Sequence, residues 1–509
     1  MSTAAQSAAS ASASARRELP GWWPLAALTL LAALLRLPTL GLQSFWYDEA
    51  FTPVHVLHQS LPDTLRAVSH TENSPPLWYL LEWVDYRLLG SGEFALRLPS
   101  ALAGIAVVPV SWAIGEIAAG RRAAIAAAAL VAVNPLFVWY SQEARAYGLF
   151  VFTAALSILC FLRLRERQDG ARVAAFAVAG VLALLSHYFA VFMLAAMAVW
   201  LLAEPRTRRA CIPALAALAL AGIALLPLIS AQGGHGTQWI GRWPLSERLQ
   251  AIPQYFLTGN SGAPLGHGVE LLIALPILGV IGLGLWRMTE PSAKSERWKQ
   301  EAESRWSSAA LLAIAASGVL APIVLAVFGA DYLAPRNLVA AMIPVTVLIA
   351  ILGTWPRCGG VGVLLISLTA AGFLAITIDV NLSPRLQRGN WRDVAKAVSA
   401  GPGPRAISTV ELGAAPLEYY LPGVHYLRPG SLITAREVFE TGYRPLRPSA
   451  GAPPAPGFHL ISREDIDGLL VYRFVAPTAR PVSEAELRRH VITLAHPEVL
   501  VPETAAAAR

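Results

Sequence analysis

The sequence predicts a polytopic α-helical membrane protein that ends in a small soluble α/β domain. Its 509 residues have a mean hydropathy of +0.50 and only 14% charged side chains, whereas soluble domains average roughly 25%. Apolar runs of about 20 residues, long enough to cross a bilayer, recur over the first three-quarters of the chain. From about residue 381 these runs give way to short strand-like segments, which marks a change of domain.

The first 20 residues are of low complexity, and we expect them to form a disordered cytoplasmic N-terminus. Arg16 and Arg17 precede the first apolar run as in a signal peptide, but no convincing small-residue cleavage site follows, so a retained first helix is expected. The three cysteines lie in or beside apolar runs and show neither a disulfide framework nor metal-type spacing.

Residues 21–380 are expected to form the membrane domain, with about eleven crossings. The predicted spans are 22–41, 98–117, 121–139, 144–163, 172–186, 187–203, 211–231, 268–287, 308–329, 338–354 and 360–380. The stretch 76–97 is too short and too charged for an ordinary span, so we expect an interfacial or partial helix there. If 76–97 were an ordinary span instead, some of the loops would lie on the opposite side of the membrane from the one predicted below. The stretch 172–203 is short for two membrane crossings.

The distribution of arginine predicts which loops share a side of the membrane. Basic loops face the cytoplasm by the positive-inside rule, and they lie at 120–122, 163–172, 204–210, 287–305 and 356–358. The complementary set faces outward: 42–75, 140–143, the turn at 186–187, 232–267, 331–337 and everything after 380. The +7 formal charge therefore sits mainly in short loops and forms no nucleic-acid-binding face.

Residues 381–509 are expected to form one small periplasmic or extracytoplasmic α/β domain. Three runs indicate strands, at 405–410, 457–462 and 468–475. A helix capped by Asn390 is expected over 390–400, and another over 483–491. The Pro/Gly-rich segment 442–457 indicates a loop.

The outward loops collect an unusual set of polar side chains. They include Asp48, Glu49, Glu72, Gln142, Arg145, His187, Tyr188, His235, Trp239 and Arg336. Ionisable groups near membrane depth are costly unless they pair or line a watery cavity, so together they indicate a functional site.

Taken singly, each of these residues also has a structural explanation. Asp48 and Glu49 could simply end the first span, and Glu72 could cap the helix that begins near residue 75. Arg145 could snorkel to the headgroups, and His187 could be a hydrogen-bonded turn histidine. The arginine of "PRN" could be a basic residue that happens to face outward. The functional interpretation rests on the whole set.

Carboxylates close to arginines suit one particular reaction at a bilayer surface. A carboxylate can take the proton of an acceptor hydroxyl as an oxocarbenium-like centre develops. Arginines, or a cation bound by a carboxylate and a histidine, can neutralise a departing phosphate. A lipid phosphate substrate would keep its isoprenoid tail in the membrane, which explains the position of the site.

Several motifs occur in an order that resembles a known superfamily. An acidic pair ends the first span, followed by "PPLWY", "YSQEARAYGL", "SHYFA", "PRN" and "NWRDVA". Over about 40–400 the chain resembles the GT-C glycosyltransferases, in particular family-39-like enzymes related to the dolichyl-phosphate-mannose protein mannosyltransferases and the lipid A aminoarabinose transferases. "PRN" departs from the commoner "PRY" of those enzymes.

The resemblance implies a GT-C fold in a cell inner membrane and inverting transfer from an undecaprenyl- or decaprenyl-phosphate sugar. The acceptor would be an envelope glycan, a glycolipid such as lipopolysaccharide, or a protein, although no MIR-type insertion of the protein mannosyltransferases is present. Asp48 would be the catalytic acidic residue, and Glu49 its orienter or a second acid. The remaining carried-over residues would bind substrate: Glu72, Gln142, Arg145, His187, Tyr188 and Arg336.

The resemblance also leaves room for a divalent cation, because in the aminoarabinose branch the carboxylate at the position of Glu72 helps to bind a metal. His235 is the candidate partner here.

Two other classes compete with the enzyme. A lipid-linked sugar flippase also has many spans and intramembrane charges, but such transporters usually show repeated halves with matching broken helices, and the sequence shows no two-fold pattern. A scaffold or sensor would need far fewer spans as an anchor. Release of free polyprenyl phosphate from a donor would distinguish the enzyme from both.

Overall fold

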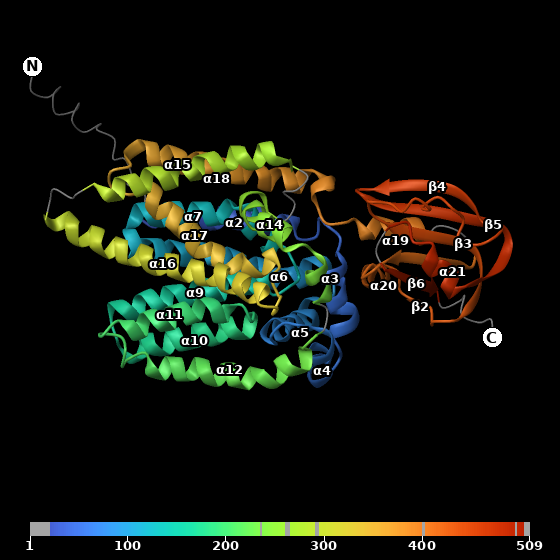
Figure 1. Cartoon of the computed structure of the whole chain (residues 1–509), viewed down its shortest axis with the longest axis horizontal. Coiled ribbons are helices and arrows are strands. Elements are labelled where there is room, and N and C mark those ends of the chain that lie inside the picture. Colours follow the sequence, from blue (N-terminus) through green and yellow to red (C-terminus); the bar gives the residue numbers. More distant parts are fainter. Residues whose placement is uncertain are drawn as a thin grey trace, which may run out of the picture.

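The chain folds into a helical body followed by a sheet domain, which lie side by side along the longest axis (Figure 1). The computed structural model describes residues 21–234, 237–259, 265–290, 295–399, 403–493 and 496–502. The predicted disordered segment 1–20 lies outside the described residues. Figure 1 shows the helices of the body running mostly parallel to one another, as spans of one bilayer do.

Among the described residues, seven helical stretches are long and apolar enough to cross a membrane. They are α6 (Glu93–Ala119), α9 (Tyr147–Glu166), α12 (Ile212–Gln232), α15 (His267–Thr289), the Glu301–Val327 part of α16 (Ser295–Val327), η4 with α17 (Pro335–Ala341 and Met342–Gly353), and α18 (Gly359–Leu382). A bent pair, α7 (Arg121–Val133) and α8 (Pro135–Ser141), could form an eighth span.

Three shorter apolar helices complete the correspondence with the eleven predicted segments. They are α2 with η1 (Trp23–Arg36 and Leu37–Thr39), α10 (Gly170–Ser186) and α11 (Ala190–Ala203). Every predicted segment therefore contains a helix, whereas the number of crossings stays a prediction.

The break between α7 and α8 has a local cause in the sequence. Pro135 has no N–H to continue the helix, and the preceding Asn134 starts a new one by accepting hydrogen bonds from the backbone of Leu136 and Phe137 at 2.9 and 3.4 Å. The two helices meet at 57°. This bend redirects the chain so that residues 142–146 lie beside α3 (Tyr47–Phe51), where the candidate site forms.

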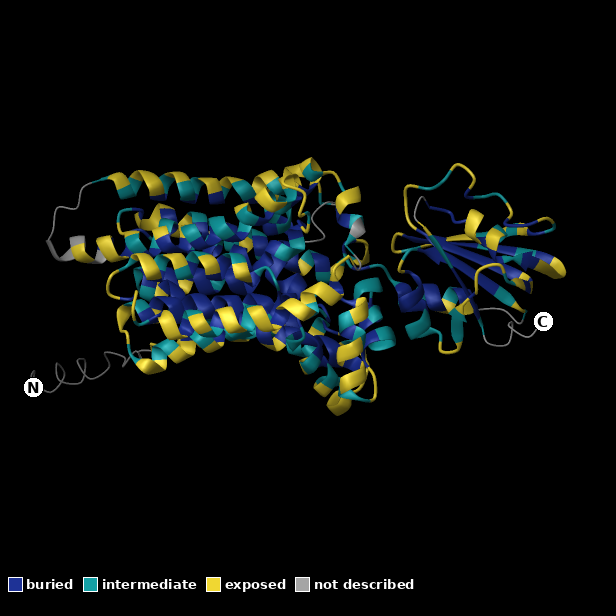
Figure 2. Cartoon of the chain, turned by 60° about the horizontal axis from the view of Figure 1, so that its bottom comes forward, coloured by how far each residue is buried: buried dark blue, intermediate teal, exposed yellow. Residues whose placement is uncertain are grey.

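The outer surface of the helical body is apolar. Large aliphatic side chains such as Leu220, Leu272 and Leu364 are more than half exposed on α12, α15 and α18. Figure 2 shows exposed residues along the outside of the helices and buried residues between them. An exposed apolar belt of this size fits a lipid environment.

The two predicted groups of loops lie at opposite ends of the helices. At one end Arg165 pairs with Glu204 at 3.4 Å and with Glu303 at 2.6 Å, which joins three of the loops expected to be cytoplasmic. At the other end Arg336 pairs with Asp48 at 2.6 Å, which joins two of the loops expected to face outward. The grouping of the loops matches the prediction, and their assignment to a side of the membrane stays a prediction.

Three segments between spans differ from a simple loop. The stretch 76–97 divides into α5 (Leu77–Leu89), which is not among the candidate spans, and the start of α6, in line with the expected partial helix. The segment 42–75 contains α3, the π-helical turn η2 (Thr52–Val56) and α4 (Leu61–Thr71). The segment 232–267, expected as a loop, contains α13 (Gln238–Arg242) and α14 (Leu245–Thr258), because α14 has an apolar face that packs on the body.

The sheet domain has six strands in the order β2-β6-β1-β3-β5-β4, with β1 and β3 parallel and the other pairs antiparallel. The strands are β1 (Arg405–Val410), β2 (Val424–Tyr426), β3 (Leu432–Gly442), β4 (His459–Ile466), β5 (Leu469–Ser483) and β6 (Pro497–Pro502). Side chains of α19 (Trp391–Ser399) and α20 (Ala414–Tyr420) share a core with one face, and α21 (Glu484–Arg489) joins the core on the other.

The three predicted strands and two predicted helices of this domain are present, and Asn390 caps α19 through the backbone N–H of Asp393 at 3.2 Å. Strands β2, β3 and β6 and helix α20 were not predicted. Strand β3 was missed because charged residues interrupt its apolar pattern. Both faces of this central strand are nevertheless covered, and Glu440 is buried with the aliphatic residues.

Glu440 makes the stability of the sheet domain depend on pH. Its side chain is 1% exposed and one carboxylate oxygen has no hydrogen-bond partner among the described residues, so burial raises its pKa from 4.5 to about 9. A raised pKa in the folded state contributes stability below pH 4.5 that is lost as the pH rises through about 9. We therefore expect Glu440→Gln to flatten the fall in melting temperature of the full chain between pH 5 and 9, measured in detergent by differential scanning fluorimetry.

Glu464→Gln is the matched control, because Glu464 is exposed on β4 of the same sheet. It should leave the pH profile of the wild type unchanged. Identical profiles for Glu440→Gln and the wild type would contradict the prediction.

Candidate functional site

A cavity of about 400 Å³ lies at the end of the helical body that faces the sheet domain. Six of the residues predicted from the sequence line it: Asp48, Glu72, Arg145, His187, Tyr188 and Arg336. The lining also contains the aromatic side chains of Tyr147 and Tyr332, from the segments that carry Arg145 and Arg336, and that of Trp239 from a further segment. Asp48 and Arg336, which are 288 positions apart in the sequence, thus meet around one space.

Asp48 and Arg336 form the ion pair that faces this cavity. The Arg336 Nη1 donates to Asp48 Oδ2 at 2.6 Å, and the two side chains are 23% and 17% exposed. The rings of Trp239 and Tyr147 lie 5.0 and 5.9 Å from the guanidinium, within the range of cation–π attraction. The pair is accessible from the cavity, and the arginine is held in a partly desolvated aromatic setting.

Arg145 is held beside Asp48 by Glu72. Its two terminal nitrogens donate to the two oxygens of Glu72 at 3.2 and 2.9 Å, a bidentate pair. Tyr79 donates a further hydrogen bond to Glu72 at 2.7 Å. Arg145 also reaches Thr52 Oγ1 at 3.3 Å, so its position is fixed relative to the segment that follows Asp48.

The contacts of Glu72 bear on the predicted divalent cation. Both of its oxygens are engaged by Arg145, and one also by Tyr79. His235 lies outside the described residues, and within the described ranges no three His, Cys, Asp or Glu side chains are grouped as a metal site would require. The described residues thus do not form a ligand set for a metal, and no step below depends on one.

His187 and Tyr188 lie at the break between α10 and α11, on the wall of the cavity. The His187 ring stacks on Phe150 at 4.6 Å, and its Nδ1 accepts a hydrogen bond from the backbone N–H of Phe189 at 3.2 Å, which places the imidazole proton on Nε2. The Tyr188 hydroxyl donates to Gln232 at 2.7 Å. Both residues shape the cavity wall through these contacts.

Glu49 does not line the cavity, although it is the neighbour of Asp48. Its side chain is fully buried and receives two hydrogen bonds from Arg97, at 2.7 and 2.6 Å, and one from the Ala144 backbone at 2.8 Å. Burial opposes ionisation of Glu49, but the charges of Arg97 and Arg388 outweigh it and hold the pKa below its usual value. Glu49 is therefore a buried anion that positions α3 and the 142–146 loop.

Arg97 binds the chain ahead of α3 as well as Glu49. Its Nη1 donates to the carbonyl oxygens of Leu40 and Gln43, both at 2.7 Å, and its Nη2 donates to that of Ser44 at 3.1 Å. The arginine thus fixes the path of the backbone that leads from the first helix to Asp48.

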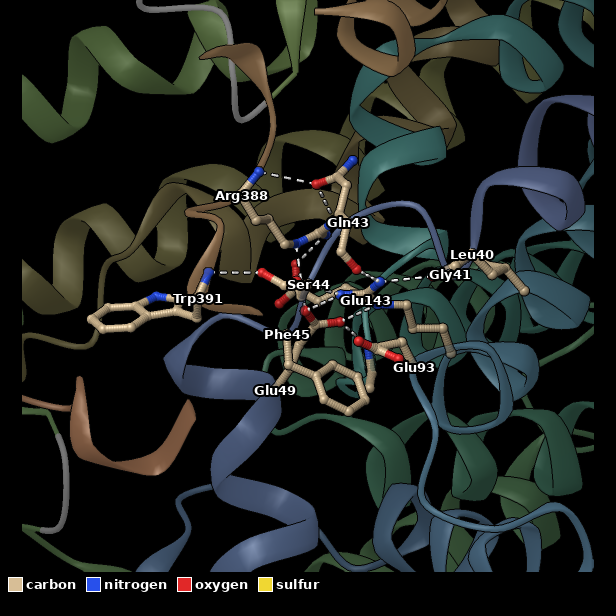
Figure 3. Close-up of polar contacts among 12 residues, drawn as sticks. Leu40, Gly41, Gln43, Ser44, Phe45, Glu49, Glu93, Glu143, Arg388 and Trp391 are labelled. Carbon is tan, nitrogen blue, oxygen red and sulfur yellow. Dashed lines mark hydrogen bonds and ion pairs between the residues drawn. The ribbon is translucent and has the colours of Figure 1, made fainter. Parts of the chain in front are cut away.

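Figure 3 shows how the linker to the sheet domain joins this buried cluster. Arg388 donates to Glu143 at 3.1 Å and to the side chain of Gln43 at 3.3 Å. The Ser44 hydroxyl accepts from the Trp391 backbone at 3.0 Å. Burial raises the pKa of Glu143 to about 7, although Arg388 opposes the shift. The first outward segment and the start of the sheet domain are thereby held together.

Gln142 is the second predicted residue that the cavity lining does not include. Its amide donates to the carbonyl oxygen of Arg36 at 3.1 Å and also to the Thr39 hydroxyl. These bonds tie the 142–146 loop to the end of α2. The position explains why this residue is polar without placing it at the candidate site.

Several residues of the site were missed from the sequence. Arg97 could have been found, because it is a charged residue near the start of a predicted span. Tyr79 closes the "PPLWY" motif, but the motif gave no indication of its contact with Glu72. Arg388 and Leu412 gave no comparable signal, because each belongs to a segment whose neighbours are set only by the fold.

Comparisons with known proteins bear on the fold of the chain. Residues 73–231 match the family model described as dolichyl-phosphate-mannose-protein mannosyltransferase. ArnT from Cupriavidus metallidurans bound to undecaprenyl phosphate is 13% identical, with a TM-score of 0.54 over 91% of this chain and 100% of that chain. Its apo state matches at 12% identity and a TM-score of 0.54, over 89% and 98% of the two chains.

A weaker structural match is the oligosaccharyltransferase AglB from Archaeoglobus fulgidus with an inhibitory peptide and a dolichol phosphate. It is 14% identical with a TM-score of 0.46, and the alignment covers 80% of this chain and 60% of that one. No curated protein matches the sequence. At these identities the two ArnT structures show a shared fold.

The buried pair of Glu49 and Arg97 predicts a large loss of stability on removal of one charge. We expect Glu49→Gln to destabilise the protein by about 3–5 kcal/mol, because it leaves Arg97 buried without its counter-ion. The measurement is the free energy of unfolding of the purified full chain, from denaturant titration in mixed micelles.

Glu82 provides the control, because it is also fully buried but neither of its oxygens has a partner in the described structure. Glu82→Gln leaves no arginine unpaired, so its effect should be about 1 kcal/mol or less. Equal destabilisation by the two substitutions would show that burial rather than the ion pair matters at Glu49.

Proposed function

We propose that the chain is a glycosyltransferase of the GT-C superfamily, which transfers a sugar from a polyprenyl phosphate to an acceptor at the outer face of a cell inner membrane. One observation carries the proposal: Asp48 and Arg336 are paired at 2.6 Å on the wall of a cavity that also holds Arg145. A base for the acceptor and cations for a phosphate thus share one space at the end of an apolar body.

A lipid-linked donor fits the lining of the cavity. Aliphatic and aromatic side chains of α11 and α12, including Val191, Phe192 and Ile229, form part of its wall. Both Val191 and Ile229 are also among the exposed hydrophobic residues, so the apolar wall continues onto the outer surface of the body. An isoprenoid chain could follow this wall while its phosphate lies near the arginines. ArnT, which has the same fold, binds undecaprenyl phosphate.

In the proposed reaction the acceptor hydroxyl attacks C1 of the donor sugar from the side of Asp48. Asp48 takes the hydroxyl proton as the new C1–O bond forms, and the bond from C1 to the phosphate oxygen breaks with inversion. The bonding electrons leave with the polyprenyl phosphate, whose charge Arg336 and Arg145 stabilise. If the acceptor were itself a phosphate, no base would be needed and Asp48 would act through its charge.

The other polar residues support this arrangement. Glu72 orients Arg145 through the bidentate pair, and Glu49 positions α3 from below the cavity wall. His187 and Tyr188 contribute to the wall that the substrate contacts. The acceptor proposed is an envelope glycan or a glycolipid, or else a protein, and its choice depends on the shape of the space beyond Asp48.

Replacement of the proposed base tests the reaction directly. Asp48→Asn should reduce transfer about 10²–10⁴-fold, because the amide cannot accept the hydroxyl proton. Binding of undecaprenyl phosphate should persist, because Arg336 no longer pairs with the Asp48 carboxylate and stays available to the phosphate. The measurement is release of undecaprenyl phosphate from a panel of radiolabelled undecaprenyl-phosphate hexoses, incubated with the reconstituted protein and envelope membranes of a deletion strain.

Asp331→Asn is the matched control, because Asp331 also pairs with an arginine at this end of the body, Arg248 at 2.6 Å, but does not line the cavity. It should leave transfer near the wild-type rate. Normal transfer by Asp48→Asn at normal expression would exclude the assigned role.

Arg336→Lys tests the phosphate contact. We expect the Kd for undecaprenyl phosphate to rise about tenfold, because lysine lacks the planar fork and stacks less well between the aromatic rings. The measurement is equilibrium binding of the labelled lipid to protein in nanodiscs. Arg242→Lys should not change the Kd, since Arg242 lies on α13 outside the cavity lining; an unaltered Kd for Arg336→Lys would place the phosphate elsewhere.

A further inference from the structure

One residue of the sheet domain reaches the cavity. Leu412 lies in the turn between β1 and α20, and among the described residues it is the one lining residue that the helical body does not supply. Its side chain is 42% exposed, so one part of it contacts the cavity and another part contacts solvent. Leu412 therefore stands at the boundary between the candidate site and bulk water.

The backbone at Leu412 is unusual for a leucine. Its φ is +67°, in the left-handed region, and Asp467 is the other non-glycine residue with positive φ in the described structure. A bulky side chain in this conformation costs on the order of 1–3 kcal/mol and persists where the surroundings impose it. Glycine or asparagine would adopt this turn more easily, so the presence of leucine calls for a contribution from its side chain.

The turn itself is tightly held. The Gly413 backbone donates to the Val410 carbonyl at 2.8 Å, and the Ala414 backbone donates to Glu498 at 3.0 Å. A Cβ on Gly413 would lie 2.4 Å from Thr409 Oγ1 and 2.9 Å from the Trp391 ring. These contacts fix the path of the chain through Leu412.

Helix α20, which follows the turn, fixes the turn relative to the helix that carries Asp48. The Tyr420 hydroxyl accepts a hydrogen bond from the Phe45 backbone and donates one to Glu93, both at 2.7 Å. Glu418 pairs with His55 at 3.0 Å, just after α3. Ala415 of α20 shares a hydrophobic core with Phe45 and Ala50. Leu412 is thus positioned against α3 by a built interface.

On the other side of the turn, Glu411 lies 3.5 Å from Arg242 of α13. The same short helix carries Trp239, whose ring lies beside Arg336 in the cavity. The turn and α13 therefore border the cavity together: the turn contributes Leu412 to the lining, and α13 contributes Trp239 and Ile240.

From this geometry we propose that Leu412 is a specificity-determining residue, which shields the cavity from bulk water so that the sugar passes to the acceptor. The inference rests on the proposed function. In the competing reaction a water oxygen bonds to C1 of the sugar, its proton passes to Asp48, and the C1–O bond to phosphate breaks to give free sugar and polyprenyl phosphate. An apolar side chain at the mouth disfavours this reaction by excluding water without removing any group that activates the donor.

The experiment measures how the labelled sugar is divided between water and acceptor. The reconstituted full chain is incubated with the undecaprenyl-phosphate hexose that the wild type consumes and with envelope membranes of a deletion strain. Free labelled hexose and label in envelope material are quantified separately. For Leu412→Gly we expect the ratio of free to transferred sugar to rise on the order of tenfold, with total donor consumption retained.

Two further variants separate this role from a structural one. Glycine relieves the backbone strain, so the melting temperature of Leu412→Gly should not fall; Leu412→Asn also tolerates positive φ, places a polar side chain at the same point, and should raise the ratio as well. Leu432→Ala removes a leucine that is 60% exposed on β3 and does not line the cavity, and should leave the ratio unchanged.

The outcomes distinguish the inference from the proposed function. A ratio equal to that of the wild type in both Leu412 variants would overturn the inference alone. A wild-type protein that consumes no donor of the panel would overturn the proposed function, and the inference with it.

Discussion

The buried pair of Glu49 and Arg97 is the interaction on which the rest of the site depends. Two full charges in the interior are tolerated only when they are paired and their remaining hydrogen-bonding groups are satisfied. Arg97 meets this condition by binding Glu49 twice and three backbone carbonyl oxygens of the preceding chain. The start of α6, the chain ahead of α3 and the 142–146 loop are therefore held at one point, directly behind the cavity.

Arg388 extends this cluster from the helical body to the sheet domain. Its contacts with Glu143 and Gln43 place the linker against the chain that carries Asp48, and α20 then packs on α3 itself. The sheet domain is thereby a structural part of the site, and its turn at Leu412 completes the cavity lining. This dependence gives a physical reason for a large domain after the last span, which a transporter or an anchored scaffold would not require.

Much of the fold could be predicted from the sequence because membrane spans depend on a simple property. An apolar run of sufficient length must form a helix in lipid, so each predicted segment contains one. Strand β1, a short run rich in β-branched residues, was also predicted. Strand β3 was not, since its charged residues alternate with aliphatic ones and Glu440 is buried in spite of its charge. Helix α14 was missed because its apolar face can be recognised only when the position of the helical body on which it packs is known.

The sequence by itself determined that carboxylates and arginines gather at one end of the helices, because hydropathy and the distribution of arginine assign each loop to a side. The family resemblance favoured Asp48 over Glu49 as the catalytic acidic residue, but nothing in the sequence showed which of the two faces the cavity. Successive residues of a helix point about 100° apart, so one neighbour faces the cavity and Arg336 while the other faces Arg97 in the interior. Only the tertiary structure decided which was which, because the partners of the two carboxylates lie 288 and 48 positions away in the chain.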